Sequence, residues 1–545
     1  MKRNTLTTAV MAGLTGMAGM MSVANAVNVN PDGLGQVLLY PYYTARGGND
    51  TLISVVNTTS AGKAVKVRFI EALNSREVLD FNIYMSPFDV WTAAISDLEE
   101  DGFGDGPGLI TADTTCTAPY FFGDQGGIQE FLNFGYAAEA VPSAGFEGTV
   151  DGGPAGIERA ASGHFEIIEM GSLEDGGAVA DAITHANGVP SDSDCSLVND
   201  LWRELPDGSP PAEPGETGYW RTNPEFGFSA EGAIGGLFGA ASIINVAEGT
   251  MFSYNATAID SFWSPNTISH TDPILVTPSL NTGNNSVSNV FVNGSVERID
   301  WFFTPGDAPF ALNATLTLAE LMNEYTLNDA VGARTEWVLT FPTKRFHVDG
   351  ALGGFLDAED DPIAPFTKKW TNESPNSCDE QTFVFWDREE TVPINDPGEP
   401  GGVGVSPPRP PNPIEEDPEF ALCRETNVIR FSNDGTLPAE TEILKEPLRT
   451  DGTGEVDLLS YTNLNLPSEF VSGWVRFNFQ GFNSLAGSAE PDSDTNNNQV
   501  IGLPVIGLGV NTFTNGTLQG GVLSNYGGTF QHRGTRQSTV ATTSP

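Results

Sequence analysis

Apolar and polar positions alternate most clearly between residues 52 and 95. Residues 65–70 and 79–85 place apolar side chains at every second position, and a short apolar run at residues 52–56 precedes them. A period of two puts one face of a strand on a core and the other face in water. Residues that favour turns separate the three segments. The region therefore predicts the strands of an antiparallel β-sandwich.

The polar positions of these strands are Lys66, Arg68, Asp80 and Asn82. Side chains of this kind are typical of a sheet face that lies in water, so we expect that face to be solvated. The preceding segment, residues 36–44, predicts a strand that contains Pro41. Because proline has no N–H to donate to a neighbouring strand, an edge or a bulge is expected there.

Similar patterns recur further along the chain. Residues 163–170 predict another strand, and residues 241–246 and 251–259 have the spacing of a hairpin with a glycine in its loop. Helices are expected at residues 127–134 and 177–187.

A third helix is expected at residues 317–325. Thr317 and Glu320 have the spacing of a capping box, in which each side chain bonds the other residue's backbone N–H.

The fold class predicted from these segments is all-β. We expect two or three antiparallel β-sandwich domains, immunoglobulin-like or jelly-roll-like, with a few short helices and long loops. Some 519 residues after a leader are too many for one core. The expected division is a signal peptide at 1–26, an N-terminal β-sandwich at 27–115, a middle β-rich region with short helices at 116–275, and a C-terminal β-sandwich at 276–545 with a disordered proline-rich insertion at 393–413.

The first 26 residues have the three parts of a secretory signal peptide. Lys2 and Arg3 are followed by an apolar stretch, and Ala24 and Ala26 fit the small-residue pattern of a cleavage site. We expect cleavage after Ala26 and no transmembrane helix after it. The predicted location is outside the cell or on its outer surface, with the periplasm as a further option.

The chain is strongly acidic, with 71 Asp and Glu against 25 Lys and Arg and a formal net charge of −46. Nucleic acids and anionic membranes are polyanions, so this balance argues against both as partners. A protein or a polysaccharide at the cell surface is the expected partner. The oligomeric state stays open.

Four cysteines are present, and an even number in an exported chain suggests two disulfides. Three pairings are open. The sequential one is favoured because each pair then falls within one sequence region: Cys116 with Cys195, and Cys378 with Cys423.

Calcium is the cofactor that the acidic loops suggest, because hard cations take six to eight oxygen ligands. The first candidate loop contains Asp492, Asp494 and Asn496, and it does not complete an EF-hand, since Asn497 and Leu503 stand where glycine and glutamate are required. The other candidates are Asp357, Glu359, Asp360 and Asp361, and then Glu99, Glu100, Asp101 and Asp105. A solvated loop is the alternative at each place.

No motif of hydrolase chemistry is present: there is no G-x-S-x-G or H-E-x-x-H, and the five histidines are far apart in the sequence. The carboxylates best placed for a glycosidase pair are Asp387, Glu389 and Glu390, beside Arg388. Ion pairing at an exposed strand end is the favoured interpretation of that cluster. No catalytic residue is therefore predicted.

The runs LISVVNTTSAGKAVKVRF, LDFNIYMSPFDVW, EWVLTFPTKR and FWDREE resemble segments of bacterial secreted and cell-surface proteins of no assigned activity. The resemblance covers most of the chain after the leader, and it implies a surface location and no mechanism.

We expect an exported acidic protein of structural or adhesive function, not an enzyme, that interacts through β-edges and acidic loops. The alternative is a carbohydrate-binding protein or a glycoside hydrolase acting outside the cell. A cleft lined by aromatic side chains, with two carboxylates about 5 to 10 Å apart, would distinguish the hydrolase.

Overall fold

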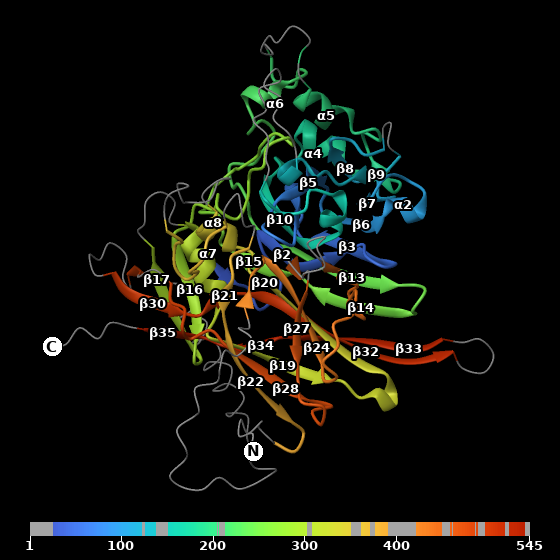
Figure 1. Cartoon of the computed structure of the whole chain (residues 1–545). Coiled ribbons are helices and arrows are strands. Elements are labelled where there is room, and N and C mark those ends of the chain that lie inside the picture. Colours follow the sequence, from blue (N-terminus) through green and yellow to red (C-terminus); the bar gives the residue numbers. More distant parts are fainter. Residues whose placement is uncertain are drawn as a thin grey trace, which may run out of the picture.

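A computed structural model describes residues 26–122, 126–137, 151–203, 205, 213–301, 308–349, 361–370, 376–390, 421–449, 458–459, 461–484, 487–488, 496–517 and 523–539. Across these residues the chain is mostly β, as predicted, and the strands pair antiparallel except for β24 and β27. Five sheets of four or more strands contain most of them (Figure 1).

Sheet 1 has seven strands and contains the hairpin that the alternating pattern predicted. That hairpin, β4–β5, lies between β10 and β8, so all its backbone groups face other strands. In order across the sheet the strands are β1 (Asn28–Val29), β15 (Thr257–Asp260), β2 (Val37–Thr44), β10 (Ser162–Ser172), β4 (Lys63–Glu71), β5 (Glu77–Met85) and β8 (Cys116–Ala118).

Sheet 2 has six strands and packs face to face on sheet 1. Tyr40 and Phe165 of sheet 1 and Trp91 of sheet 2 belong to one buried cluster between them. The predicted hairpin at residues 241–259 is confirmed as β13–β14. In order the strands are β14 (Thr250–Asn255), β13 (Leu237–Asn245), β3 (Asn49–Asn57), β6 (Val90–Asp97), β7 (Pro107–Ile110) and β9 (Ile128–Glu130).

Sheet 3 lies between that core and sheet 4. Val338 and Leu508 on one of its faces join the cluster of sheets 1 and 2, whereas Trp337 on the other face packs with Phe477 of sheet 4. The strands of sheet 3 are β27 (Tyr461–Asn465), β24 (Thr426–Ser432), β20 (Ala333–Thr340), β32 (Ile506–Thr517) and β33 (Leu523–Gln531). Those of sheet 4 are β22 (Thr382–Asp387), β28 (Ser472–Asn478), β19 (Glu320–Thr326) and β34 (Arg533–Thr535).

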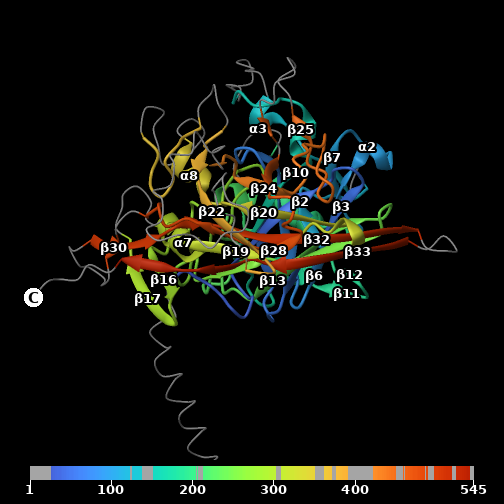
Figure 2. The ribbon, with the colours of Figure 1, turned by 60° about the horizontal axis from the view of Figure 1, so that its bottom comes forward.

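Sheet 5 lies at the left of Figure 1, at the opposite end from the projecting hairpin β32–β33, and Figure 2 shows the same separation. Helix α7 (Ala308–Leu316), which is buried along its whole length, packs on it. Its strands are β16 (Val287–Val292), β17 (Ser295–Asp300), β29 (Gly487–Ser488), β30 (Asn496–Ile501) and β35 (Gln537–Thr539).

Three short helices cover part of the outer face of sheet 1, above β5, β8 and β10 in Figure 1. They are α4 (Ala178–Ile183), α5 (Ser196–Trp202) and α6 (Tyr219–Thr222). Their apolar side chains form a buried cluster with Tyr84 and Met170 of the sheet. The other short helical segments are α2 (Leu98–Asp101), α3 (Phe134–Ala137), η2 (Ile157–Ala161), η3 (Asp329–Val331) and α8 (Lys344–Val348).

Two of the three predicted helices are wrong. Residues 317–325 form β18 (Thr317–Leu318) and β19, because β19 pairs with both β28 and β34 and buries Leu321 and Tyr325 at a period of two. Sheet pairing on both sides outweighs one local capping pattern. Residues 127–134 contain strand β9, and the helix expected at 177–187 is confirmed as α4.

Pro41 lies in β2 between β15 and β10, so the strand is not an edge of sheet 1. The expected bulge is confirmed, since the pairing of β10 with β2 shifts register between Gly163 and Phe165, opposite Pro41. The unpaired position accommodates a residue without an N–H.

Both favoured disulfides are confirmed: Cys116–Cys195 and Cys378–Cys423. The first joins β8 to the start of α5. The second joins the segment before β21 (Asp379–Glu380) to the one after β23 (Ala421–Leu422). Such bonds are typical of an oxidising, extracellular environment. None of the helices described is both long and apolar enough to cross a membrane.

The predicted boundary after residue 115 lies inside sheets 1 and 2, because strands from the predicted middle region complete both of them. The number of domains and the sandwich type stay predictions. The signal sequence before Ala26 and the proline-rich segment 393–413 lie outside the described residues.

Candidate functional site

The outer face of sheet 1 is buried, and the prediction that its polar residues are solvated is wrong. Lys66, Arg68 and Asn82 are shielded from solvent. Lys66 Nζ lies 2.9 Å from Asp80 Oδ2 and donates to the backbone oxygen of Pro273, in a segment that crosses over the sheet. The charges are therefore paired under a cover, as buried charges require.

Arg68 is the centre of this covered face. Its Nε lies 2.6 Å from Glu77 Oε2, and its Nη1 pairs with Glu166 of the neighbouring strand β10. The two charges of opposite sign stand beside one another on paired strands, which is a favourable cross-strand arrangement. Removal of any one partner would leave another charge buried without compensation.

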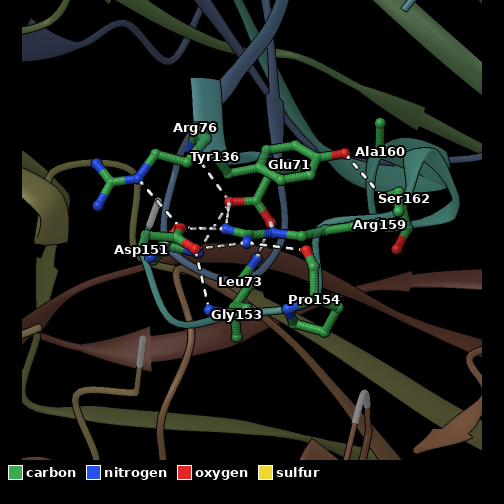
Figure 3. A network of polar contacts seen from close by, with 12 residues as sticks. Glu71, Leu73, Arg76, Tyr136, Asp151, Gly153, Pro154, Arg159, Ala160 and Ser162 are labelled. Carbon is green, nitrogen blue, oxygen red and sulfur yellow. Dashed lines mark hydrogen bonds and ion pairs between the residues drawn. The ribbon is translucent and has the colours of Figure 1, made fainter. Parts of the chain in front are cut away.

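A second buried network lies at the end of β4 (Figure 3). Arg159 donates to both carboxylate oxygens of Glu71 at 2.9 and 3.1 Å, and to Asp151 at 2.7 and 3.0 Å. Its guanidinium also lies 4.2 Å from the ring centroid of Tyr136. Arg76 extends the network to Asp349, at 2.6 Å.

The network in Figure 3 is a structural brace rather than a ligand site. Burial acts to raise the pKa of Glu71, but the ion pair with Arg159 and backbone N–H donors outweigh it, so this pKa is lowered and the carboxylate stays charged. The adjoining cavity has a volume of about 10 Å³, enough for one water molecule. Its contacts join residues that are up to 273 positions apart in the sequence.

The outer face of sheet 2 differs because it is open to solvent. Even-numbered residues of β3, β6 and β13 point outward and form rows across the sheet. One row is apolar and consists of Phe238, Val56 and Val90. The next row is small, and consists of Ala240, Ser54 and Thr92.

These rows produce a trough across the strands. The small side chains form its floor, while Leu52 and Ile110 line its far side. The trough has a volume of about 430 Å³ and none of its lining residues is charged. Leu52 and Phe238, at 44% and 41% exposure, are apolar side chains that an ordinary strand face would bury.

An acidic group marks one end of this face. Ser96 Oγ lies 2.6 Å from both Asp50 Oδ1 and Asp101 Oδ2. Burial raises the pKa of Asp50, and the neighbouring carboxylates raise it further, against the hydrogen bond from Ser96. Charge is therefore restricted to the border of the trough.

Two tryptophans stand on the outer face of sheet 4. Trp386 of β22 is directly opposite Trp474 of β28, and their rings stack with centroids 4.1 Å apart and planes 12° apart. The opposite face of the same strands contributes Val475 and Phe477 to the core. The indole pair therefore projects away from the protein interior.

The carboxylates proposed as an alternative glycosidase pair lie in a turn at the end of β22. Asp387 Oδ1 accepts the backbone N–H of Glu389 at 2.9 Å, and Glu390 has a positive φ of 63°. This is the geometry of an Asx-type turn, in which Asp387 stabilises the chain reversal. No opposing carboxylate of a catalytic pair is defined by these contacts.

The five histidines lie in five separate places. Burial lowers the pKa of His164 and His270 to about 3 and that of His347 and His532 to about 4, so these rings are neutral at pH 7. His185 Nδ1 lies 2.9 Å from Ser86 Oγ and 3.8 Å from Asp89 Oδ2. A catalytic triad places serine and aspartate on different ring nitrogens, so this contact is not one.

Of the predicted calcium ligands, Asp492, Asp494, Asp357, Glu359 and Asp360 lie outside the described residues. Asn496 begins strand β30, and Asp361 is in an exposed segment. Glu99, Glu100 and Asp101 form the one-turn helix α2. Among described residues, no group of three or more His, Cys, Asp or Glu side chains is arranged to hold a metal ion.

The sequence analysis did not identify the trough or the indole pair. The trough had one available signal: the outward positions of residues 50–56 and 238–244 are apolar or small and uncharged except Asp50. The indole pair had none, since 88 positions of sequence separate Trp386 from Trp474 and only strand pairing brings them together.

Comparison of the chain with protein-family models, with curated proteins and with solved structures finds no match. The resemblance to bacterial secreted proteins therefore stays a prediction, and functional inference rests on the surfaces described above.

Proposed function

We propose that the protein is an exported structural protein of the cell exterior that associates with further copies of itself through the outer face of sheet 2. The observation on which this rests is the uncharged trough on a chain whose formal net charge is −46. On such a chain, a neutral face of this size is the place where a second acidic copy can make contact without opposing like charges.

The shape of the face favours a copy related by a twofold axis. An apolar row formed by Phe238, Val56 and Val90 stands beside the small row of Ala240, Ser54 and Thr92. A twofold axis can place the ridge of one copy in the trough of the other, since an isologous interface uses the same patch twice. Sheets that pack face to face in this way lie about 10 Å apart.

The area is large enough for a specific contact. Strands spaced about 4.8 Å apart and rising about 3.3 Å per residue make the face from β14 to β7 about 19 Å by about 30 Å, on the order of 600 Å² in each copy. Two such faces bury about 1,200 Å² together, at the lower limit of stable protein interfaces.

Charge makes the association dependent on salt. Two chains of net charge −46 repel one another at long range, and the Debye length falls from about 30 Å at 0.01 M salt to about 10 Å at 0.1 M. We therefore expect a monomer at low salt and a dimer or larger assembly at 0.5 M sodium chloride. The two disulfides and the predicted leader support a place outside the cell.

Analytical ultracentrifugation of the full chain tests the proposal. Ser54→Glu and Ala240→Glu place like charges in the trough, and we expect both variants to stay monomeric at 0.5 M salt while the unmodified protein associates. Ser295→Glu is the matched control, because Ser295 is an exposed residue of β17 outside this face. A protein that is monomeric at every salt concentration, or trough variants that associate as well as the control, would overturn the proposal.

A further inference from the structure

The tryptophans of this chain are divided sharply between core and surface. All nine lie in the described residues, and seven of them are buried. The remaining two are Trp386 and Trp474, and these are the two that stack on each other on the outer face of sheet 4. Trp474 is 37% exposed. An unburied indole pair on a surface that packs on no other sheet is unlike the use of tryptophan elsewhere in the fold.

The pair is held by the surrounding side chains. Arg476 lies two residues after Trp474 on the same face of β28, with its guanidinium carbon 5.4 Å from the ring centroid of Trp386. Arg476 Nη1 also lies 3.6 Å from Glu320 Oε1 on β19. The Tyr325 hydroxyl donates to the backbone oxygen of Trp386 from below. These contacts fix the rings before any ligand arrives, which reduces the entropy lost on binding.

Polar groups border the rings. Glu324 is directly opposite Trp474 on β19 and is exposed, and the guanidinium of Arg476 is partly exposed. A carboxylate accepts hydrogen bonds from hydroxyl groups and a guanidinium donates to their oxygens. The site therefore offers a flat apolar surface with an acceptor and a donor beside it.

We infer that this surface binds a neutral oligosaccharide. A pyranose ring has an apolar C–H face that can lie against an electron-rich indole, and hydroxyl groups at its edge that can reach Glu324 and Arg476. Acidic sugars and nucleic acids are disfavoured, because the chain has a net charge of −46 and Glu320 and Glu324 flank the rings.

The site and the self-association face use different sheets. Sheet 4 contributes the rings, and sheet 2 contributes the trough. A copy bound to others through sheet 2 would therefore present several glycan sites at once, which raises the apparent affinity for a polymer without any new contact.

Isothermal titration of the full chain with defined hexasaccharides tests the inference. The probes are neutral β-glucan, α-glucan, β-mannan and chitin hexamers, with an alginate hexamer as the acidic probe and phosphocholine as the cationic one. We expect at least one neutral hexamer to bind. Trp474→Ala and Trp386→Ala should each weaken that binding at least tenfold.

Phe530→Ala is the matched control, because Phe530 is an exposed aromatic residue of another sheet. It should leave the affinity unchanged. Absence of binding to every neutral hexamer, binding of alginate or phosphocholine alone, or equal loss in the Phe530→Ala variant would overturn the inference. The monomeric Ser54→Glu variant should bind a hexamer as the unmodified protein does, which separates this result from failure of self-association.

Discussion

The outer faces of sheets 1 and 2 are the two sides of one pair of packed sheets, yet their surroundings are opposite. The face of sheet 1 is rich in charged residues and is buried, whereas that of sheet 2 is made largely of apolar and small residues and is open. Polarity along a strand therefore does not tell whether the strand face meets water. What decides it is whether each polar group finds a partner of opposite charge under a cover.

The cover of sheet 1 consists of segments that are distant in sequence. His270 Nε2 lies 2.9 Å from the Tyr84 hydroxyl, and Lys66 reaches the backbone of Pro273. Helices α4 to α6 complete the cover. Sheet 2 has no such layer over the trough in the described residues, and small uncharged side chains there tolerate water without needing a partner.

The largest effect is expected from breaking the charge pairing under the cover. Arg68→Met leaves Glu77 and Glu166 without their cation, so the free energy of unfolding should fall by about 3 to 5 kcal/mol. Chemical denaturation followed by circular dichroism measures it. Arg334→Met is the control, since the exposed pair of Arg334 and Asp329 should contribute about 1 kcal/mol or less. Equal losses in both variants would contradict the contrast.

The next effect concerns the attachment of the cover. Replacement of Cys116 and Cys195 by alanine removes the bond between β8 and α5, and should cost about 2 to 5 kcal/mol. Hydrogen exchange should show faster exchange in α4 to α6 while β3 and β13 keep their protection. The Cys378→Ala, Cys423→Ala variant should leave exchange in α4 to α6 unchanged. Faster exchange there as well would show that the cover is not held by its own disulfide.

A pH effect of about 2 kcal/mol is expected from each buried histidine between pH 7 and pH 5. Burial lowers the pKa of His270 to about 3 from its ordinary value of 6.5. The unfolded chain therefore binds a proton below pH 6.5 that the folded chain does not, and stability is lost as pH falls from 6.5 toward 3. Denaturation at pH 7 and pH 5 measures the slope. His270→Gln should reduce it by about 2 kcal/mol; an unchanged slope would contradict a neutral His270 in the cover.

The smallest effect is expected on the open face. Ser54→Glu should change the free energy of unfolding of the monomer at low salt by no more than about 0.5 kcal/mol, because the side chain points into water and no buried group loses a partner. The same denaturation measurement checks this. A loss above about 2 kcal/mol would show that the face is covered in solution and would remove the contrast with sheet 1.

The sequence by itself determined the mostly antiparallel β fold, the strands of the first hairpin, the hairpin β13–β14 and the disulfide pairs. These follow from local pattern and from nearest pairing along the chain, where short sequence distances decide the outcome. The bulge at Pro41 was also predictable, because it depends on the missing N–H of one residue.

Tertiary structure alone decided which strand faces are covered, and this is where the local pattern misled. Alternation of Lys66 and Arg68 with apolar residues defines two faces of β4 and does not say what lies above either one. The capping pattern at Thr317 and Glu320 failed because β28 and β34 offered a strand between them more hydrogen bonds and burial than an isolated turn of helix could gain.

The two candidate surfaces have the same origin. Phe238 meets Val56, and Trp386 meets Trp474, through strand register between segments more than 80 residues apart. The sequence supplied residues with the right chemistry for each surface. Only sheet pairing placed them side by side, since pairing fixes which side chains stand opposite one another on a shared face.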